Sequence, residues 1–152
     1  MSRIHDLGLK LEGIPQLLDE YETAFDSIEA NLTLKGKTLD HALKEQSTWP
    51  IYYEMRKSEL RTIVKYMDDQ VNKVRGQLTR KLVENYSRQL GERLLGTYVD
   101  AEPEYVKMRE LYLEVEELYD KYSAAAEAFT KRGFALRDLT TARVHQIQDS
   151  SL

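Results

Sequence analysis

The chain has 152 residues, with 22 Lys and Arg, 26 Asp and Glu, and no Cys. This length is typical of one domain, since domains run to about 100–200 residues, and the lack of Cys excludes disulfides, thiolate metal sites and a Cys nucleophile. Only 3 Pro and 7 Gly are present, which favours a few long helices over a many-stranded sandwich or barrel.

Residues 1–50 are predicted to form an N-terminal helical segment. A first helix follows Pro15, because apolar residues recur at spacings of three and four as far as Leu32, and Gly36 ends it. A short second helix begins after Thr38, whose side chain suits an N-cap. The apolar residues of this second helix are Leu39, Ala42 and Leu43.

Residues 51–96 are predicted to form one long basic helix, opened by Pro50. Its apolar residues alternate steps of four and three, a heptad pattern, and after Leu78 the step is a constant four, so the apolar face rotates toward a different neighbour. Gly76 and Gly91 are weak points. An unbroken helix of this length would span about 67 Å, too long for a small monomer to bury, so we expect part of it to contact another subunit.

Residues 97–152 are predicted to form a C-terminal helical segment after a linker over residues 96–102, with Asp100 as a plausible N-cap. Apolar residues then step by three and four to Phe129, and Gly133 interrupts the pattern. The three segments are expected to form one all-α domain whose long helices pack like a coiled coil in a helical-bundle oligomer. The residues expected at the oligomer interface are Leu60, Val64, Met67, Val71, Met108, Leu111, Val115, Leu118, Tyr122, Phe129 and Phe134.

Basic residues gather in the middle of the chain, although the net charge is −4. Residues 50–99 carry 10 basic and 6 acidic groups, a net charge of +4, whereas both flanking thirds are acidic. A basic stripe on a helix can follow a phosphate backbone, and the alternative is a solvated coiled-coil flank. Tyr52, Tyr53 and Tyr66 are candidates for stacking on bases. The candidate DNA-binding residues are Lys73, Arg75, Arg80, Lys81, Arg88 and Arg132.

No pattern in the chain predicts catalysis, a cofactor or a metal. The run Gly36-Lys37-Thr38 lacks the earlier glycine and the preceding strand of a phosphate-binding loop. The histidines His5, His41 and His145 are far apart, whereas metal ligands usually come in close pairs. We therefore expect a non-enzymatic protein. The N-terminus lacks the apolar segment of a signal peptide, and no apolar run approaches about 18 residues, so a cytoplasmic location without a membrane span is expected.

Two short motifs stand in the second half of the chain. The run from Asp100 to Lys107 opens a helix, and Lys131-Arg132-Gly133-Phe134-Ala135-Leu136 follows about 25 residues later. This arrangement resembles the C-terminal part of the UvsY-type recombination mediators of tailed phages. Upstream, Leu78–Leu82 and Asn85-Tyr86-Ser87 are similar to the family's short basic box and the segment after it. The resemblance covers about residues 55–145, while residues 1–50 form an unmatched extension. Arg80 and Lys81 are adjacent here, whereas the family alternates basic and apolar residues.

The resemblance implies an accessory protein of phage DNA recombination and repair. Such a protein binds single-stranded DNA and helps to load a RecA-like recombinase onto strands coated with single-strand-binding protein, in the host cytoplasm if it is phage-encoded. It also implies a homo-oligomeric ring, a hexamer or heptamer. The alternative is a structural coiled-coil oligomer, such as a phage assembly chaperone or scaffold, which would form oligomers without binding DNA.

Overall fold

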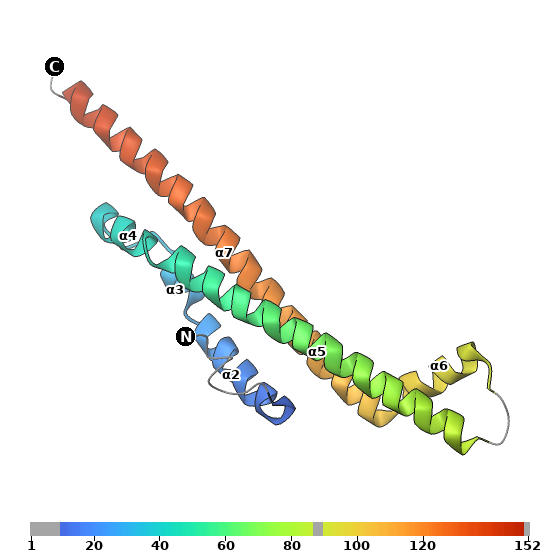
Figure 1. Cartoon of the computed structure of the whole chain (residues 1–152). Coiled ribbons are helices and arrows are strands. Elements are labelled where there is room, and N and C mark those ends of the chain that lie inside the picture. Colours follow the sequence, from blue (N-terminus) through green and yellow to red (C-terminus); the bar gives the residue numbers. More distant parts are fainter. Residues whose placement is uncertain (1–9, 87–89, 151–152) are drawn as a thin grey trace. The chain divides into compact units, whose positions relative to one another are not determined.

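The computed structural model describes residues 10–86 and 90–150, and every regular element in these residues is a helix (Figure 1). This confirms the all-α prediction. In chain order the elements are the 3₁₀ helix η1 (Leu11–Gly13) and the α-helices α2 (Ile14–Phe25), α3 (Ile28–Leu32), α4 (Leu39–Gln46), α5 (Trp49–Asn85), α6 (Glu92–Ala101) and α7 (Pro103–Ser150).

The three prolines stand in first turns, as predicted. Pro15 and Pro50 are the second residues of α2 and α5, and Pro103 is the first residue of α7. Proline is tolerated there because its missing N–H would have no partner inside the helix. Glu102 has the extended backbone expected of a residue before proline, which separates α6 from α7.

The N-terminal segment differs from the prediction in one place. The helix expected to run as far as Leu32 is divided into α2 and α3 by Asp26 and Ser27. Short polar side chains compete for backbone groups, and Ser27 Oγ donates a hydrogen bond to the Ala24 carbonyl at 3.0 Å. The predicted N-cap is confirmed, because Thr38 Oγ1 accepts a hydrogen bond from the His41 N–H at 3.2 Å.

The single helix predicted over residues 51–96 is two helices. Helix α5 ends at Asn85, and α6 begins after Gly91, which takes an extended N-cap conformation. Glycine is a poor residue for a helix interior, which fits this break. Most of the linker predicted at 96–102 is therefore helical. Helix α7 continues through Gly133, where an interruption was expected.

The contacts divide the chain into two compact units, and the single domain stays a prediction. Among the described residues, one unit holds residues 10–59 and 120–150, and the other holds residues 60–86 and 90–119. We call these the terminal unit and the central unit. Helices α5 and α7 each contribute to both.

Aromatic side chains fill the core of the terminal unit. Tyr53 and Phe129 stack at 4.6 Å between ring centroids, and Tyr122 packs edge-on against Tyr21 at 5.7 Å. The Tyr122 hydroxyl donates to the Tyr21 carbonyl at 2.7 Å, and the Tyr21 hydroxyl donates to Glu59. Burial raises the pKa of both phenols, so they stay protonated donors across the neutral range.

The core of the central unit joins three helices. Val74 and Leu78 of α5 pack with Val99 of α6, so α6 lies against the end of α5. The partly buried residues around this cluster are Leu82, Tyr105 and Met108. Leu82, the first residue of the constant-four spacing, packs against this cluster and so meets α6 within the same chain.

Most residues predicted at an oligomer interface are buried within the chain itself. The buried residues of that set are Leu60, Met67, Val71, Val115, Leu118, Tyr122 and Phe129. Val64, Met108 and Leu111 are half-buried, and Phe134 is exposed. The periodicity identified the apolar faces correctly, but a chain that returns on itself covers them with its own helices. The buried members are therefore core residues.

Candidate nucleic-acid interface

Four of the predicted DNA-binding residues lie exposed on the second half of α5. They are Lys73, Arg75, Arg80 and Lys81, which we call the α5 basic cluster. Arg80 pairs with Glu84 at 3.0 Å and Arg75 with Asp100 at 3.6 Å. Exposed pairs of this kind are worth about 0–1 kcal/mol, so a phosphate can displace the carboxylates at little cost. Arg88, predicted beside this cluster, lies outside the described residues.

The three tyrosines proposed to stack on bases are all buried or half-buried. Tyr53 is fully buried and stacks on Phe129, so it is a core residue. Tyr52 and Tyr66 are half-buried, and the Tyr52 ring packs edge-on against Trp49 at 5.8 Å. None of the three lies in the part of α5 that carries the basic cluster.

Sequence analysis missed an exposed aromatic pair in the central unit. Tyr86, just after α5, and Tyr98 of α6 stack with ring centroids 6.0 Å apart and ring planes at 21°. The constant-four spacing after Leu78 was the available signal, because it carries successive residues around the helix and away from the core.

Arg132, predicted to contact DNA, is instead a buried structural residue of the terminal unit, with 5% of its surface exposed. Its guanidinium donates from Nε to the Leu32 carbonyl at 3.0 Å and from Nη1 to Gln46 Oε1 at 2.9 Å. Nη2 forms an ion pair with Glu45 at 2.9 Å. A guanidinium whose donors are engaged inside the protein cannot also bind phosphate, so Arg132 is removed from the DNA-binding set.

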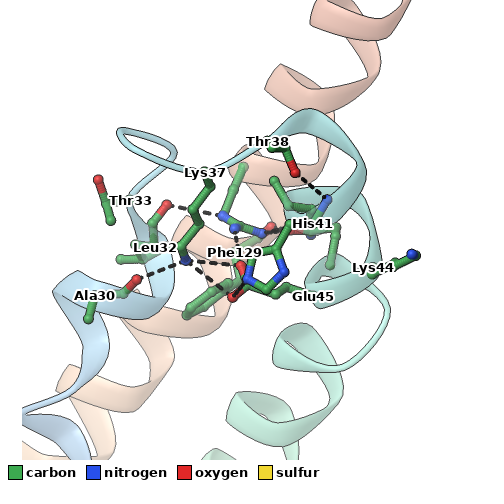
Figure 2. Close-up of polar contacts among 12 residues, drawn as sticks. Ala30, Leu32, Thr33, Lys37, Thr38, His41, Lys44, Glu45 and Phe129 are labelled. Carbon is green, nitrogen blue, oxygen red and sulfur yellow. Dashed lines mark hydrogen bonds and ion pairs between the residues drawn. The ribbon is translucent and has the colours of Figure 1, made fainter.

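The partly buried Glu45 is the acceptor shared by this network (Figure 2). Lys37 Nζ lies 2.9 Å from Glu45 Oε2 and also donates to the Ala30 carbonyl at 2.9 Å. His41 Nε2 lies 3.1 Å from Glu45 Oε1. The hydrogen bond from Lys37 is the largest cause that holds the pKa of Glu45 below its ordinary value. The carboxylate therefore stays charged at lower pH than an ordinary glutamate. The network ties the segment before α4 to α7.

Gly133 leaves room for this network. A Cβ at Gly133 would lie 2.9 Å from Gln46 Nε2, and that amide donates to the Phe129 carbonyl at 2.8 Å. A side chain at position 133 would therefore displace the Gln46 amide from this hydrogen bond.

Two glycine substitutions test this packing. In Gly76→Ala, the new methyl meets nothing within 4 Å, so we expect a gain of about 0.5–1 kcal/mol from helix propensity and backbone entropy. Gly133→Ala receives the same gain but displaces the Gln46 amide, which costs about 1–3 kcal/mol of hydrogen bonding. Urea unfolding followed by far-ultraviolet circular dichroism should show Gly133→Ala to be the less stable variant. Equal gains at both positions would contradict the packing role.

Neither a group of metal ligands nor a membrane-spanning helix is found in the parts of the chain that the structure describes. No group of three or more His, Asp or Glu side chains there could hold a metal ion. None of the described helices is both long and apolar enough to cross a membrane.

A scan of protein-family models, a search of curated proteins and a search of solved structures found no match to this chain.

Proposed function

We propose that this protein binds single-stranded DNA through the α5 basic cluster and helps to load a RecA-like recombinase onto strands coated with single-strand-binding protein. The observation that carries the DNA-binding step is the exposure of Lys73, Arg75, Arg80 and Lys81 along one helix. The motifs shared with UvsY-type mediators support the recombination role. On this proposal the protein acts without catalysis, in the host cytoplasm if it is phage-encoded.

Electrostatics makes the cluster a suitable phosphate contact despite the acidic net charge. Residues 73–93 carry 6 basic and 2 acidic groups, so the local charge is +4 against −4 for the whole chain. Bound counterions leave when lysine and arginine neutralise phosphates, and this release drives binding. Such contacts read no bases, so binding should tolerate any sequence and weaken strongly with salt.

A homo-oligomer would strengthen a weak contact of this kind. In a ring of six or seven subunits, several basic clusters engage one strand, and avidity raises affinity by about 10²–10⁴-fold. Because most of the predicted interface residues are core residues, self-association requires other apolar side chains. The exposed large apolar residues on the last third of α7 are Leu139, Val144 and Ile147. Coiled-coil contacts between subunits along this exposed part of α7 belong to the same proposal.

The second candidate is a structural oligomer, such as a phage assembly chaperone or scaffold. The same exposed residues favour it, since Leu139, Val144 and Ile147 lie on a helix end that can pack on another helix. This candidate requires assembly but no DNA binding. A DNA titration therefore separates the two functions.

The DNA-binding proposal is tested with the double variant Arg80→Ala/Lys81→Ala. We expect the wild type to bind labelled oligo-dT more tightly than its duplex, with an affinity that falls steeply as salt rises. Loss of two phosphate contacts should flatten the slope of log affinity against log salt by about 1.4 for a single strand. Fluorescence anisotropy at several salt concentrations measures both quantities.

A charge-matched control is available in the terminal unit. Lys131→Ala/Arg137→Ala removes the same charge from exposed positions of α7, and we expect it to keep the wild-type salt slope. If both double variants behave alike, the effect is one of net charge and the α5 basic cluster is the wrong assignment. If the wild type fails to bind oligo-dT even at low salt, the DNA-binding function is wrong and the structural oligomer takes its place.

A further inference from the structure

The tyrosine pair lies at the surface of the central unit, with both residues exposed to solvent. Tyr86 is 47% exposed and Tyr98 is 40% exposed. Each ring is attached beside buried structure: Tyr86 donates its backbone N–H to Leu82 at 3.1 Å, and Val99 next to Tyr98 is a core residue. The pair is therefore held by the packing of α6 on α5, while the rings themselves remain accessible.

Two tyrosine rings in this arrangement are an incomplete aromatic stack. The ring planes are nearly parallel, at 21°, and the centroids lie 6.0 Å apart, which is an offset stack. A third flat ring can extend such a stack over an exposed ring face. Stacking of a base on an aromatic side chain is worth about 1–3 kcal/mol and tolerates every base, since each has a π-face.

The charges around the pair select the kind of partner that the rings can receive. Arg80 and Lys81 lie within two helical turns of Tyr86 along the chain, and Arg93 is exposed on α6, the helix that carries Tyr98. Val83 and Leu94 are also exposed there. An apolar patch alone would fit a protein partner, but a patch within a segment of net charge +4 fits a ligand that combines flat rings with negative charge.

We infer that Tyr86 and Tyr98 form a base-stacking platform for single-stranded nucleic acid, with the α5 basic cluster holding the phosphates beside it. This inference rests on the proposed function, because it supplies the base contacts that the basic cluster lacks. It also gives a physical reason for a preference for single strands, since the bases of a duplex are already stacked on one another and their faces are not free.

The test compares two ligands that differ only in their bases. One is oligo-dT, and the other is an oligomer of the same length that carries abasic sites throughout, so that its phosphates are kept and its bases are missing. We expect the wild type to bind oligo-dT at least about fivefold more tightly, the lower end of the range for one stacked base. In Tyr98→Leu this preference should vanish while the affinity for the abasic oligomer stays unchanged.

Two further variants separate the ring from the rest of the side chain. Tyr98→Phe keeps the ring and removes only the hydroxyl, so we expect it to retain the preference for oligo-dT. Tyr86→Leu should behave like Tyr98→Leu. As a direct signal, 2-aminopurine placed within the oligomer should be quenched by stacking on the wild type and less by either leucine variant. Circular dichroism establishes that each variant is folded.

Each outcome points to a different conclusion. If neither oligomer binds the wild type, the proposed DNA-binding function itself is wrong. If both bind equally and the leucine variants change nothing, DNA binding stands and the platform is wrong, which leaves the exposed rings to a protein partner. If a folded leucine variant loses affinity for both oligomers alike, the rings only position the basic cluster, and the stacking role is overturned.

Discussion

Replacing Arg132 with methionine should destabilise the terminal unit by about 3 kcal/mol. Removing one partner of a buried ion pair usually costs about 3–5 kcal/mol, because a buried charge is left without compensation. We expect the lower end of that range, since Lys37 still neutralises Glu45 from 2.9 Å. The remaining loss comes from the carbonyls of Leu32 and Ala42, which accept from Arg132 and would lose that donor.

The fluorescence of Trp49 can report this loss of stability, because the chain has 1 Trp and the signal comes from one site. Its indole lies 6.3 Å from the Phe129 ring inside the terminal unit, so its fluorescence should change when that core opens. Urea unfolding followed by Trp49 emission then gives the free energy of unfolding of Arg132→Met.

The adjacent lysine is the control for Arg132. Lys131 is exposed, and its Nζ forms an ion pair with Glu127 on the same helix at 2.7 Å. Lys131→Met should therefore change stability by less than about 0.5 kcal/mol. A stable Arg132→Met variant that loses affinity for oligo-dT would contradict the structural role and restore Arg132 as a DNA contact.

Local signals in the sequence predicted much of the fold. The three prolines and the cap at Thr38 act on neighbouring backbone groups, so the helix starts that they mark can be predicted from adjacent residues. The apolar periodicity of Leu60, Met67 and Val115 likewise identified faces that are buried. What periodicity cannot supply is the partner of each face, because packing within a chain and packing between chains use the same pattern.

The role of Arg132 depended on contacts far away in the sequence, but one sequence signal was present. Its hydrogen-bond partners lie in and around residues 32–46, about 90 positions earlier, and no local pattern links them. Yet Phe129, Arg132 and Leu136 are separated by steps of three and four, which places Arg132 on the apolar face of α7. An arginine at such a position is a candidate for a buried pair rather than a surface contact.

One part of the candidate site could be predicted from local sequence, and the other depends on packing between helices. The exposed residues of the α5 basic cluster belong to one helix, and charge counting along the chain was enough to select them. The pair of Tyr86 and Tyr98 exists only because α6 turns back against α5, with Val99 packed on Val74. The sequence predicted a helix straight through this turn, so the two rings could not be placed together.

Phe129→Ala should cost the terminal unit about 3–5 kcal/mol, the usual range for removing a buried phenylalanine. Phe129 is 0% exposed and stacks on Tyr53, so truncation leaves a cavity beneath that ring. The alanine variant also loses the aromatic pair, worth about 0.5–1.5 kcal/mol beyond burial. Urea unfolding followed by Trp49 emission measures the loss, and the midpoint should fall well below that of the wild type.

Phe134 is the matched control, because it lies on the same helix and is 53% exposed. Phe134→Ala should leave the free energy of unfolding within about 0.5 kcal/mol of the wild type. Sedimentation of both variants separates a core role from an interface role. If Phe129→Ala keeps wild-type stability and sediments at a lower mass, Phe129 lies between subunits and its assignment to the core is wrong. If it unfolds early while Phe134→Ala remains stable, the apolar face of α7 that contains Phe129 is used within the chain, and any contact between copies of the chain would have to use exposed residues.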